Sequence, residues 1–226
     1  MAGEASKTVP SEAGSTATRI LDAAEELFAE RGFAGVSVRE IAGRVGLNQA
    51  SIYNHFPSKQ ALYEAVLERG FTPIRDLLAE GKGSFLSRDF QERLLERLVD
   101  HLWHTPRLPK LVQREVLDGG EYLERLIDRW LTPIYLQGKR AMEATPGLVD
   151  WPEEDRPLLI LGLYHLLFGY FTSVALYARV LGKDPLSPEM RRTHLAFLRR
   201  ASDRLLHQDV SASTRWITFS GDPDTG

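Results

Sequence analysis

The sequence predicts an all-α fold of about nine helices, and three features of the chain support this. Apolar residues recur at intervals of three and four, which is the period of a helix buried on one face. The alternating pattern of a half-buried strand is almost absent. Glycines and prolines recur between the periodic segments and divide them into pieces of helix length.

The composition is that of an ordinary globular protein. The chain has 226 residues, of which 43% are hydrophobic, so it can form one large domain or two small ones. It has no cysteine, which excludes disulfides, thiol catalysis and zinc–thiolate sites. The net charge is −3, so binding to a nucleic acid would depend on local charge. Residues 1–15 lack the apolar segment of a signal peptide, and we expect a disordered arm there.

Two short helices are predicted after a first helix that ends at Gly32. Ser37 and Glu40 have the spacing of a capping box, which starts the second helix, and Gly46 ends it. Asn48 is a good cap for a third helix over residues 49–55, which Pro57 then breaks. A fourth helix follows.

The second and third helices, joined by a Gly-Leu-Asn turn, form a helix-turn-helix, which places its second helix in the major groove of DNA. Ile52 and Phe56 face inward. Glutamine can bond adenine, serine can bond a base or a phosphate, and an alanine methyl can contact thymine. Tyrosine, histidine and Lys59 can reach phosphates. The residues left outside are Gln49, Ala50, Ser51, Tyr53, Asn54 and His55.

Local charge agrees with this interpretation, although only modestly. Between residues 34 and 60 the basic residues are Arg39, Arg44 and Lys59, and the only acid is Glu40. A solvated surface on a small helical bundle would show the same polar residues. Spacing alone therefore leaves both interpretations open.

The rest of the chain also reads as helices, expected near 71–81, 88–105, 107–117, 120–144, 153–181 and 187–207. Residues 157–178 carry no formal charge and are long enough to span a bilayer. Polar residues spread along this segment, such as His165 and Thr172, favour a buried or interface helix and no membrane. The last residues, 208–226, are expected to form a tail.

Two stripes suit an interface between two copies of the chain. Small residues allow helices to approach closely, and a three-four apolar stripe lies on the last helix. The same stripes could instead form the core of one subunit. The residues concerned are Gly162, Gly169, Ser173, Met190, His194, Phe197, Ala201 and Leu205.

A ligand pocket would need aromatic walls and a few polar groups, and each candidate could equally be plain core. The candidates are Trp103, His104, Trp130, Tyr135, Met142, Tyr164, His165, Phe168 and Phe171. His101 and His104 share a helix face, but no third ligand is tied to them, so no metal site is expected. No dinucleotide loop, P-loop, zinc-protease motif or nucleophile elbow is present, so we expect neither an enzyme nor a cofactor.

The segment "RILDAAEELFAERGFAGVSVREIAGRVGLNQASIYNHFPSKQALYEAVLE" resembles the N-terminal domain of the TetR/AcrR family of transcriptional regulators. The resemblance covers about a quarter of the chain. It implies that Ser37 and Arg39 lie near DNA and that Gln49, Ala50 and Ser51 read bases. It also implies phosphate contacts from Tyr53, His55 and Lys59, with Thr18 or Arg19 helping at the start of the first helix.

The same resemblance implies a domain organisation and a function. Residues 16–68 would bind DNA and residues 69–207 would dimerise and bind a small molecule. The expected protein is a cytoplasmic, nucleoid-associated homodimeric repressor, released from a palindromic double-stranded operator by an unknown, mainly apolar effector. The alternative is a DNA-binding dimer whose larger domain meets a protein partner or only dimerises.

Overall fold

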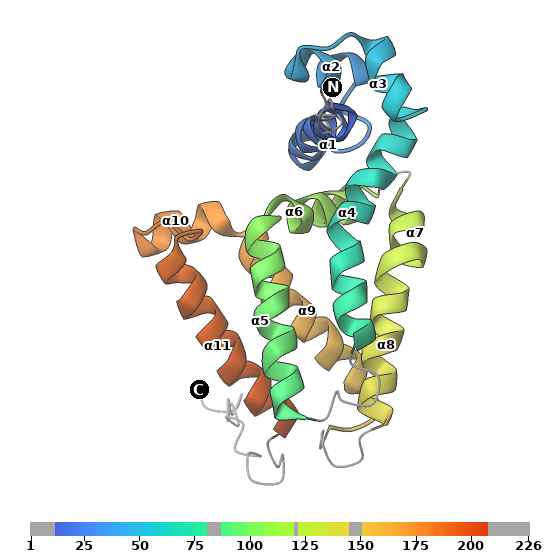
Figure 1. Ribbon diagram of the computed structural model, residues 1–226. Helices are drawn as coiled ribbons and strands as arrows, with labels where there is room; N and C mark the ends of the chain where they lie inside the picture. The colour runs from blue at the N-terminus through green and yellow to red at the C-terminus, as the bar shows by residue number, and fades with distance from the viewer. Residues whose placement is uncertain (1–11, 81–86, 120–121, 145–150, 208–226) are drawn as a thin grey trace, which may run out of the picture.

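The computed structural model describes residues 12–80, 87–119, 122–144 and 151–207, and every regular element in these ranges is helical. The predicted all-α fold is confirmed. Figure 1 shows a small N-terminal group of helices above a larger bundle. The predicted tail falls outside the described residues, as do residues 1–11 of the predicted arm, and helix α1 already begins at Glu12.

The small group consists of α1 (Glu12–Arg31), α2 (Val38–Val45), α3 (Gln49–His55) and the first half of α4 (Lys59–Glu80). One apolar side chain or more from each helix is removed from solvent in a shared core. The most deeply buried include Ile20, Phe28, Ile41, Ile52 and Leu62. This core sets the angle between the two helices of the helix-turn-helix.

Helix α4 runs without a break from the small group into the larger bundle (Figure 1). A separate helix near 71–81 was expected, and this expectation is wrong, because α4 continues through Gly70 and Phe71 and ends only at Glu80. Gly70 lets α6 (Arg107–Asp118) approach closely, since a Cβ there would lie 2.6 Å from Leu108 Cδ1. The Nε2 atom of His101 lies 2.7 Å from the Gly70 carbonyl oxygen.

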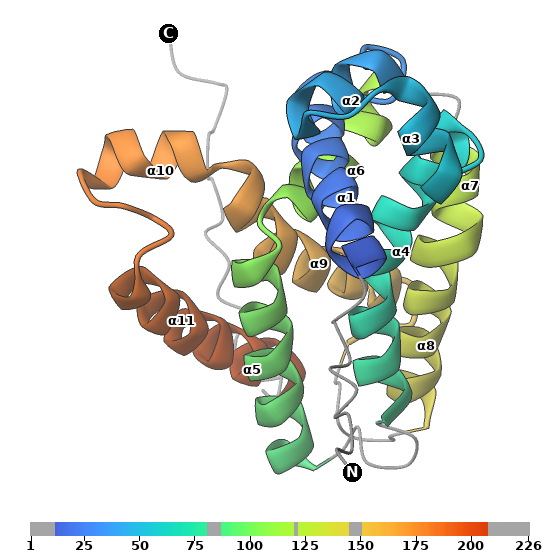
Figure 2. The same ribbon diagram turned by 45° about the horizontal axis from the view of Figure 1, so that its top comes forward.

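In the larger bundle, α5 (Arg88–His104) packs between α4 and the last helix, α11 (Pro188–His207). Helix α6 lies between α1 and α9 (Arg156–Thr172), and Figure 2 shows α1 in front of it. The helix expected over 120–144 is a run of α7 (Leu123–Leu126), a π turn η1 (Ile127–Leu131) and α8 (Thr132–Glu143). The larger bundle therefore contacts the small N-terminal group, which we call the reading head, mainly through α4 and α6.

The helix expected over 153–181 is wrong in one respect, since the chain bends by 71° between α9 and α10 (Val174–Leu181). The Thr172 hydroxyl donates to the Gly169 carbonyl at 3.0 Å, and such back-bonding bends helices. Among the described helices none alone has the length and apolarity of a membrane span, and α9 and α10 reach it only as a bent pair.

Candidate nucleic-acid interface

Helix α2 begins at a complete capping box. The Glu40 N–H donates to Ser37 Oγ at 3.2 Å, and the Ser37 N–H donates to Glu40 Oε2 at 2.8 Å. Hydrogen bonds from Ser37 and Arg31 lower the pKa of Glu40 to about 2, so this carboxylate stays charged. Gly46 ends α2 with φ of 71°, a left-handed conformation that glycine adopts without strain.

Helix α3 is short and depends on its cap and on one buried side chain. Asn48 Oδ1 accepts from the Ser51 N–H at 2.8 Å and from the Ser51 hydroxyl at 3.0 Å. Ile52 is 1% exposed and anchors the helix to the core. At the other end, the Phe56 N–H donates to the Ile52 carbonyl at 2.9 Å. These contacts fix which face of α3 points outward.

The outward face of α3 carries the polar residues that the sequence predicted. Gln49, Ala50, Tyr53 and Asn54 are exposed, while Ser51 and His55 are half-buried. The Gln49 Nε2 amide donates to Tyr53 Oη at 3.2 Å. The amide has a second hydrogen and a carbonyl oxygen left for a base edge. This face can therefore offer both donors and acceptors to the major groove.

Two cations flank this face. Arg39 is exposed on α2. Lys59 starts α4, and its Nζ lies 4.2 Å from the centre of the Phe33 ring. The Ala61 N–H donates to Ser58 Oγ at 3.0 Å, so a serine side chain also satisfies the start of α4. Lys59 is thus held by an aromatic ring at a helix N-terminus, where anions are favoured.

Three other groups in this region are already engaged by the protein itself. Arg19 Nη2 donates to the Val45 carbonyl at 2.7 Å, at the end of α2. The Ser37 hydroxyl donates to Glu40 Oε2 at 2.8 Å. Arg44 pairs with Glu26 of α1. The local positive charge is therefore smaller than the sequence count suggested, and Arg19 stabilises the helix-turn-helix.

The residues considered for an interface between copies divide into two sets. Met190 and His194 are buried within the subunit, and they contribute to its own interior. A Cβ added at Gly162 or Gly169 would meet nothing within 4 Å, so these positions face open space. Phe197 is 47% exposed. Ser173, Ala201 and Leu205 are half-buried.

Most of the pocket candidates pack against other rings of the core. Trp130 stacks on Phe71, and Trp103 contacts Tyr170 and Phe171. Tyr164 stacks on Phe168, and Tyr135 and Met142 are half-buried.

The two histidine candidates line recesses instead. His104 borders a recess of about 430 Å³ between α4 and α5. His165 borders an apolar groove of about 600 Å³ that α9, Trp151 and Leu205 form. Among the described residues no three His, Cys, Asp or Glu side chains are grouped to hold a metal ion.

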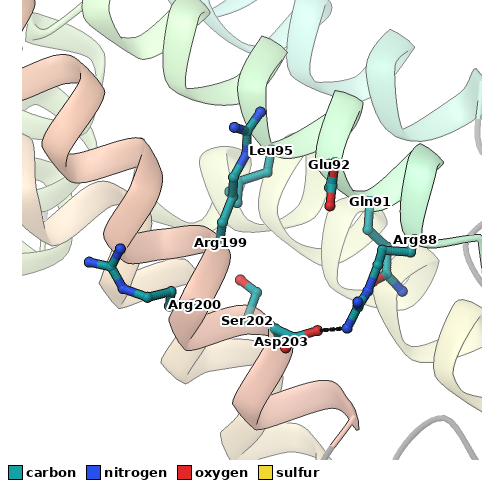
Figure 3. Close-up of a pocket in the computed structure, with 8 residues that line it drawn as sticks. All are labelled: Arg88, Gln91, Glu92, Leu95, Arg199, Arg200, Ser202 and Asp203. Carbon is teal, nitrogen blue, oxygen red and sulfur yellow. Dashed lines mark hydrogen bonds and ion pairs between the residues drawn. The ribbon is translucent and has the colours of Figure 1, made fainter.

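A further recess between α5 and α11 was not anticipated. It measures about 240 Å³ and is lined mostly by polar residues. Figure 3 shows Arg88 extending across it to pair with Asp203, while Arg200 points away from both. Arg199 is paired with Glu96 of α5. These ion pairs join α5 to α11. They also neutralise the two arginines, which could otherwise bind an anion in the recess.

Comparisons with known proteins agree with this geometry. Residues 20–66 match the family of bacterial regulatory proteins called the tetR family. The chain is 29% identical to the HTH-type transcriptional regulator YttP of Bacillus subtilis, over 68% of this chain and 72% of that one. It is 40% identical to the HTH-type transcriptional repressor KstR2 of Rhodococcus jostii, but over only 30% of this chain and 35% of that protein.

Solved structures show the same fold along most of the chain. A transcriptional regulator of the TetR/AcrR family from Aquifex aeolicus has a TM-score of 0.56 and 22% identity, covering 82% of this chain and 96% of its own. A mutant of the HlyIIR protein has a TM-score of 0.62 and 18% identity, covering 87% and 100%. Residues 20–66 therefore belong to the tetR family of bacterial regulatory proteins, and the relatives that the chain matches are HTH-type transcriptional regulators.

Proposed function

We propose that this protein is a homodimeric repressor that binds a palindromic operator and is released from it by a small, mainly apolar effector. The outward face of α3 is the single observation that carries the proposal. Its polar residues serve no core, and the Asn48 cap and the Ile52 anchor hold them outward. Binding to chromosomal DNA places the protein in the cytoplasm.

In this proposal Gln49, Ala50 and Ser51 contact base edges, while Tyr53, His55 and Lys59 contact phosphates. The exposed position of Gln49 and Ala50 supports the first role. Arg39, exposed on α2, adds a further phosphate contact. Arg19 and Ser37 act indirectly, because their side chains already stabilise α2.

The homodimer would form through the outward faces of α9 and α11. Gly162 and Gly169 leave room for a second helix, and Phe197 exposes a large apolar ring on α11. Leu158 and Leu161 of α9 are 66% and 48% exposed. An isologous dimer carries two reading heads related by a two-fold axis, which is why a palindromic operator is expected.

The groove beside His165 is where we propose that the effector binds. It is bordered by Trp151, Leu159 and Leu166, which suit an apolar molecule, with Asp155 at its rim. Leu158 and Gly162 also line it, so in this proposal the effector site adjoins the dimer face of α9. An effector that favours one arrangement of the two heads shifts the equilibrium by its difference in affinity. The alternative is that the larger domain only dimerises or binds a protein, which is supported by the close packing of the aromatic candidates.

Selection of genomic DNA fragments by the purified protein tests the DNA-binding proposal. We expect one palindrome whose binding weakens as salt rises. Gln49→Ala should then lower affinity by about 1–3 kcal/mol and relax specificity at one base pair. Tyr53→Phe should weaken binding to all fragments alike. If neither variant changes affinity for the selected palindrome, the docking of α3 is wrong.

A thermal-shift screen of small apolar molecules separates the two roles of the larger domain. An effector present at about 100 times its dissociation constant adds about 2.7 kcal/mol of stability. Such a compound should also weaken binding to the selected palindrome. If stabilising compounds leave DNA binding unchanged, the larger domain is not an effector sensor for this site.

A further inference from the structure

A buried glutamate joins the larger bundle to the reading head. Glu115 lies on α6 and is only 3% exposed. One of its oxygens accepts from the Tyr63 hydroxyl of α4 at 2.8 Å. The other accepts from the Tyr122 backbone N–H at 3.0 Å. A carboxylate removed from water is costly unless it is hydrogen-bonded, so these two donors hold α4, α6 and the start of α7 together.

The two tyrosines are part of an aromatic cluster that reaches the turn after α1. The rings of Tyr63 and Tyr122 lie 5.1 Å apart, and Phe33 lies 5.1 Å from Tyr63 and 4.2 Å from Tyr122. Phe28 contacts Tyr63 edge-on at 5.0 Å. Offset and edge-to-face contacts at these distances are favourable, so the cluster behaves as one packed block.

Phe33, at one end of this cluster, contacts Lys59, which follows α3 in the chain. Lys59 Nζ lies 4.2 Å from the centre of the Phe33 ring, within the range of a cation–π contact. The four-carbon stem of lysine is flexible, so an isolated lysine at this position would sample many rotamers. The Phe33 face restricts it. The position of Phe33 in turn depends on Tyr63 and Tyr122, which Glu115 fixes.

We propose that Glu115 is a positioning residue for DNA binding, which acts through Tyr63, Tyr122 and Phe33 to hold the Lys59 ammonium in place for an operator phosphate. This inference rests on the proposed phosphate contact of Lys59. It adds that a residue of the larger bundle, which touches no DNA, sets that contact.

Neighbouring contacts support a rigid connection here. The turn that carries Phe33 begins at Gly32, where an added Cβ would lie 3.2 Å from Asp118 Oδ2 of α6. Burial, together with the Glu115 carboxylate, raises the pKa of Tyr63, so its hydroxyl stays protonated and donates at all ordinary pH values. The small N-terminal group therefore contacts α6 in two ways, by the close approach of the Gly32 backbone and by the buried hydrogen bond from Tyr63.

The test compares Tyr63→Phe and Glu115→Gln with Tyr170→Phe in the full chain. The Tyr170 hydroxyl is also buried and donates to the Pro185 carbonyl at 2.7 Å. Removing it should destabilise the fold to a similar degree, at a position far from Lys59 in the chain. The measurement is affinity for a duplex, selected by the unaltered protein from a random pool, across a series of salt concentrations. Thermal unfolding is followed in parallel.

We expect Tyr63→Phe and Glu115→Gln to reduce the slope of log affinity against log salt by about 0.9 for each phosphate that the protein no longer neutralises. Lys59→Met should reduce it equally, and Tyr63→Phe added to Lys59→Met should reduce it no further, because both act on the same phosphate. Tyr170→Phe should lower the melting temperature and leave the slope unchanged.

Two results would overturn these ideas separately. If Lys59→Met leaves the slope unchanged, Lys59 does not contact a phosphate and that part of the proposed function fails. If Lys59→Met reduces the slope but Tyr63→Phe and Glu115→Gln change only the melting temperature, as Tyr170→Phe does, Glu115 stabilises the fold and does not position the lysine.

Discussion

His194 is the residue whose burial makes the most direct prediction about pH. It is 6% exposed, its ring lies 4.0 Å from that of Tyr170, and its Nε2 atom has no hydrogen-bond partner in the described part of the chain. Burial lowers the pKa of His194 from 6.5 to about 4. The folded protein therefore keeps this ring neutral at a pH where the unfolded chain binds a proton.

Above about pH 6.5, protonation of His194 should not reduce the free energy of unfolding. The free energy should fall as the pH drops toward 4, because the unfolded state then binds a proton that the folded state excludes. At pH 5 the loss is about 2 kcal/mol. Chemical denaturation at pH 7.5 and pH 5 measures it. His194→Phe keeps a ring against Tyr170 and should show a smaller difference between the two pH values. An equal difference in both proteins would contradict this assignment.

Gly70 predicts a steric cost at the crossing of α4 and α6. A Cβ at this position would lie 2.6 Å from Leu108 Cδ1, and Leu108 is 3% exposed, so it has little room to move. Overpacking of this kind costs about 1–3 kcal/mol, which exceeds the gain of about 1 kcal/mol from replacing a helical glycine with alanine.

Gly70→Ala should therefore lower the free energy of unfolding in urea. Gly43→Ala is the matched control, since Gly43 lies within α2 and an added Cβ there meets nothing within 4 Å. The control should be neutral or stabilising by up to about 1 kcal/mol. If both variants are stabilised alike, the close approach of α6 to α4 is not needed by the fold.

At the scale of the helices, local signals were readable from sequence and distant ones were not. The caps at Ser37 and Asn48 were predicted because their partners lie three residues away. The bend after Thr172 was missed because no proline marks it in the sequence. The bond between Tyr63 and Glu115 joins residues 52 positions apart, and no spacing rule connects them.

Two further features also depend on tertiary packing. A separate helix was expected near 71–81, yet α4 continues without a break before residue 71, and Phe71 and Ile74 are buried there. Arg19 was expected near DNA, and its side chain also donates to the Val45 carbonyl at the end of α2, a contact between residues 26 positions apart. The exposed face of α3 could be predicted because the Asn48 cap and the Ile52 anchor that fix it are local to the helix.

Helix α3 has only 7 residues, so its cap should matter more than in a long helix. Asn48→Ala removes the acceptor for the Ser51 N–H and should cost about 1 kcal/mol, and it should weaken DNA binding because Gln49 and Ala50 follow the cap directly. Asn48→Ser supplies another capping oxygen and should retain both properties. Circular dichroism melts and operator binding measure the two effects. Equal losses in both variants would show that Asn48 has a role other than capping.

At the scale of the whole molecule, α4 and α6 connect the two functions that we propose for different parts of the chain. The apolar groove and the outward faces of α9 and α11 belong to the larger bundle, while the reading face belongs to α3. Helix α6 packs against both α1 and α9. A movement of α9 in the dimer would therefore reach the reading head through α6 and its Glu115 contact.

The proposed dimer gives the last prediction. Phe197 is 47% exposed on α11, and burying the rest of its ring between two copies would contribute about 1 kcal/mol per subunit. Phe197→Arg should convert the dimer to a monomer, because two guanidinium groups would meet near the two-fold axis without a partner. Light scattering measures the mass. Affinity for a palindrome should fall toward that for a single half-site.

Leu117→Arg is the control, since Leu117 is 74% exposed on α6, and it should leave the mass unchanged. A dimer that persists with Phe197→Arg would place the interface elsewhere than on this face of α11.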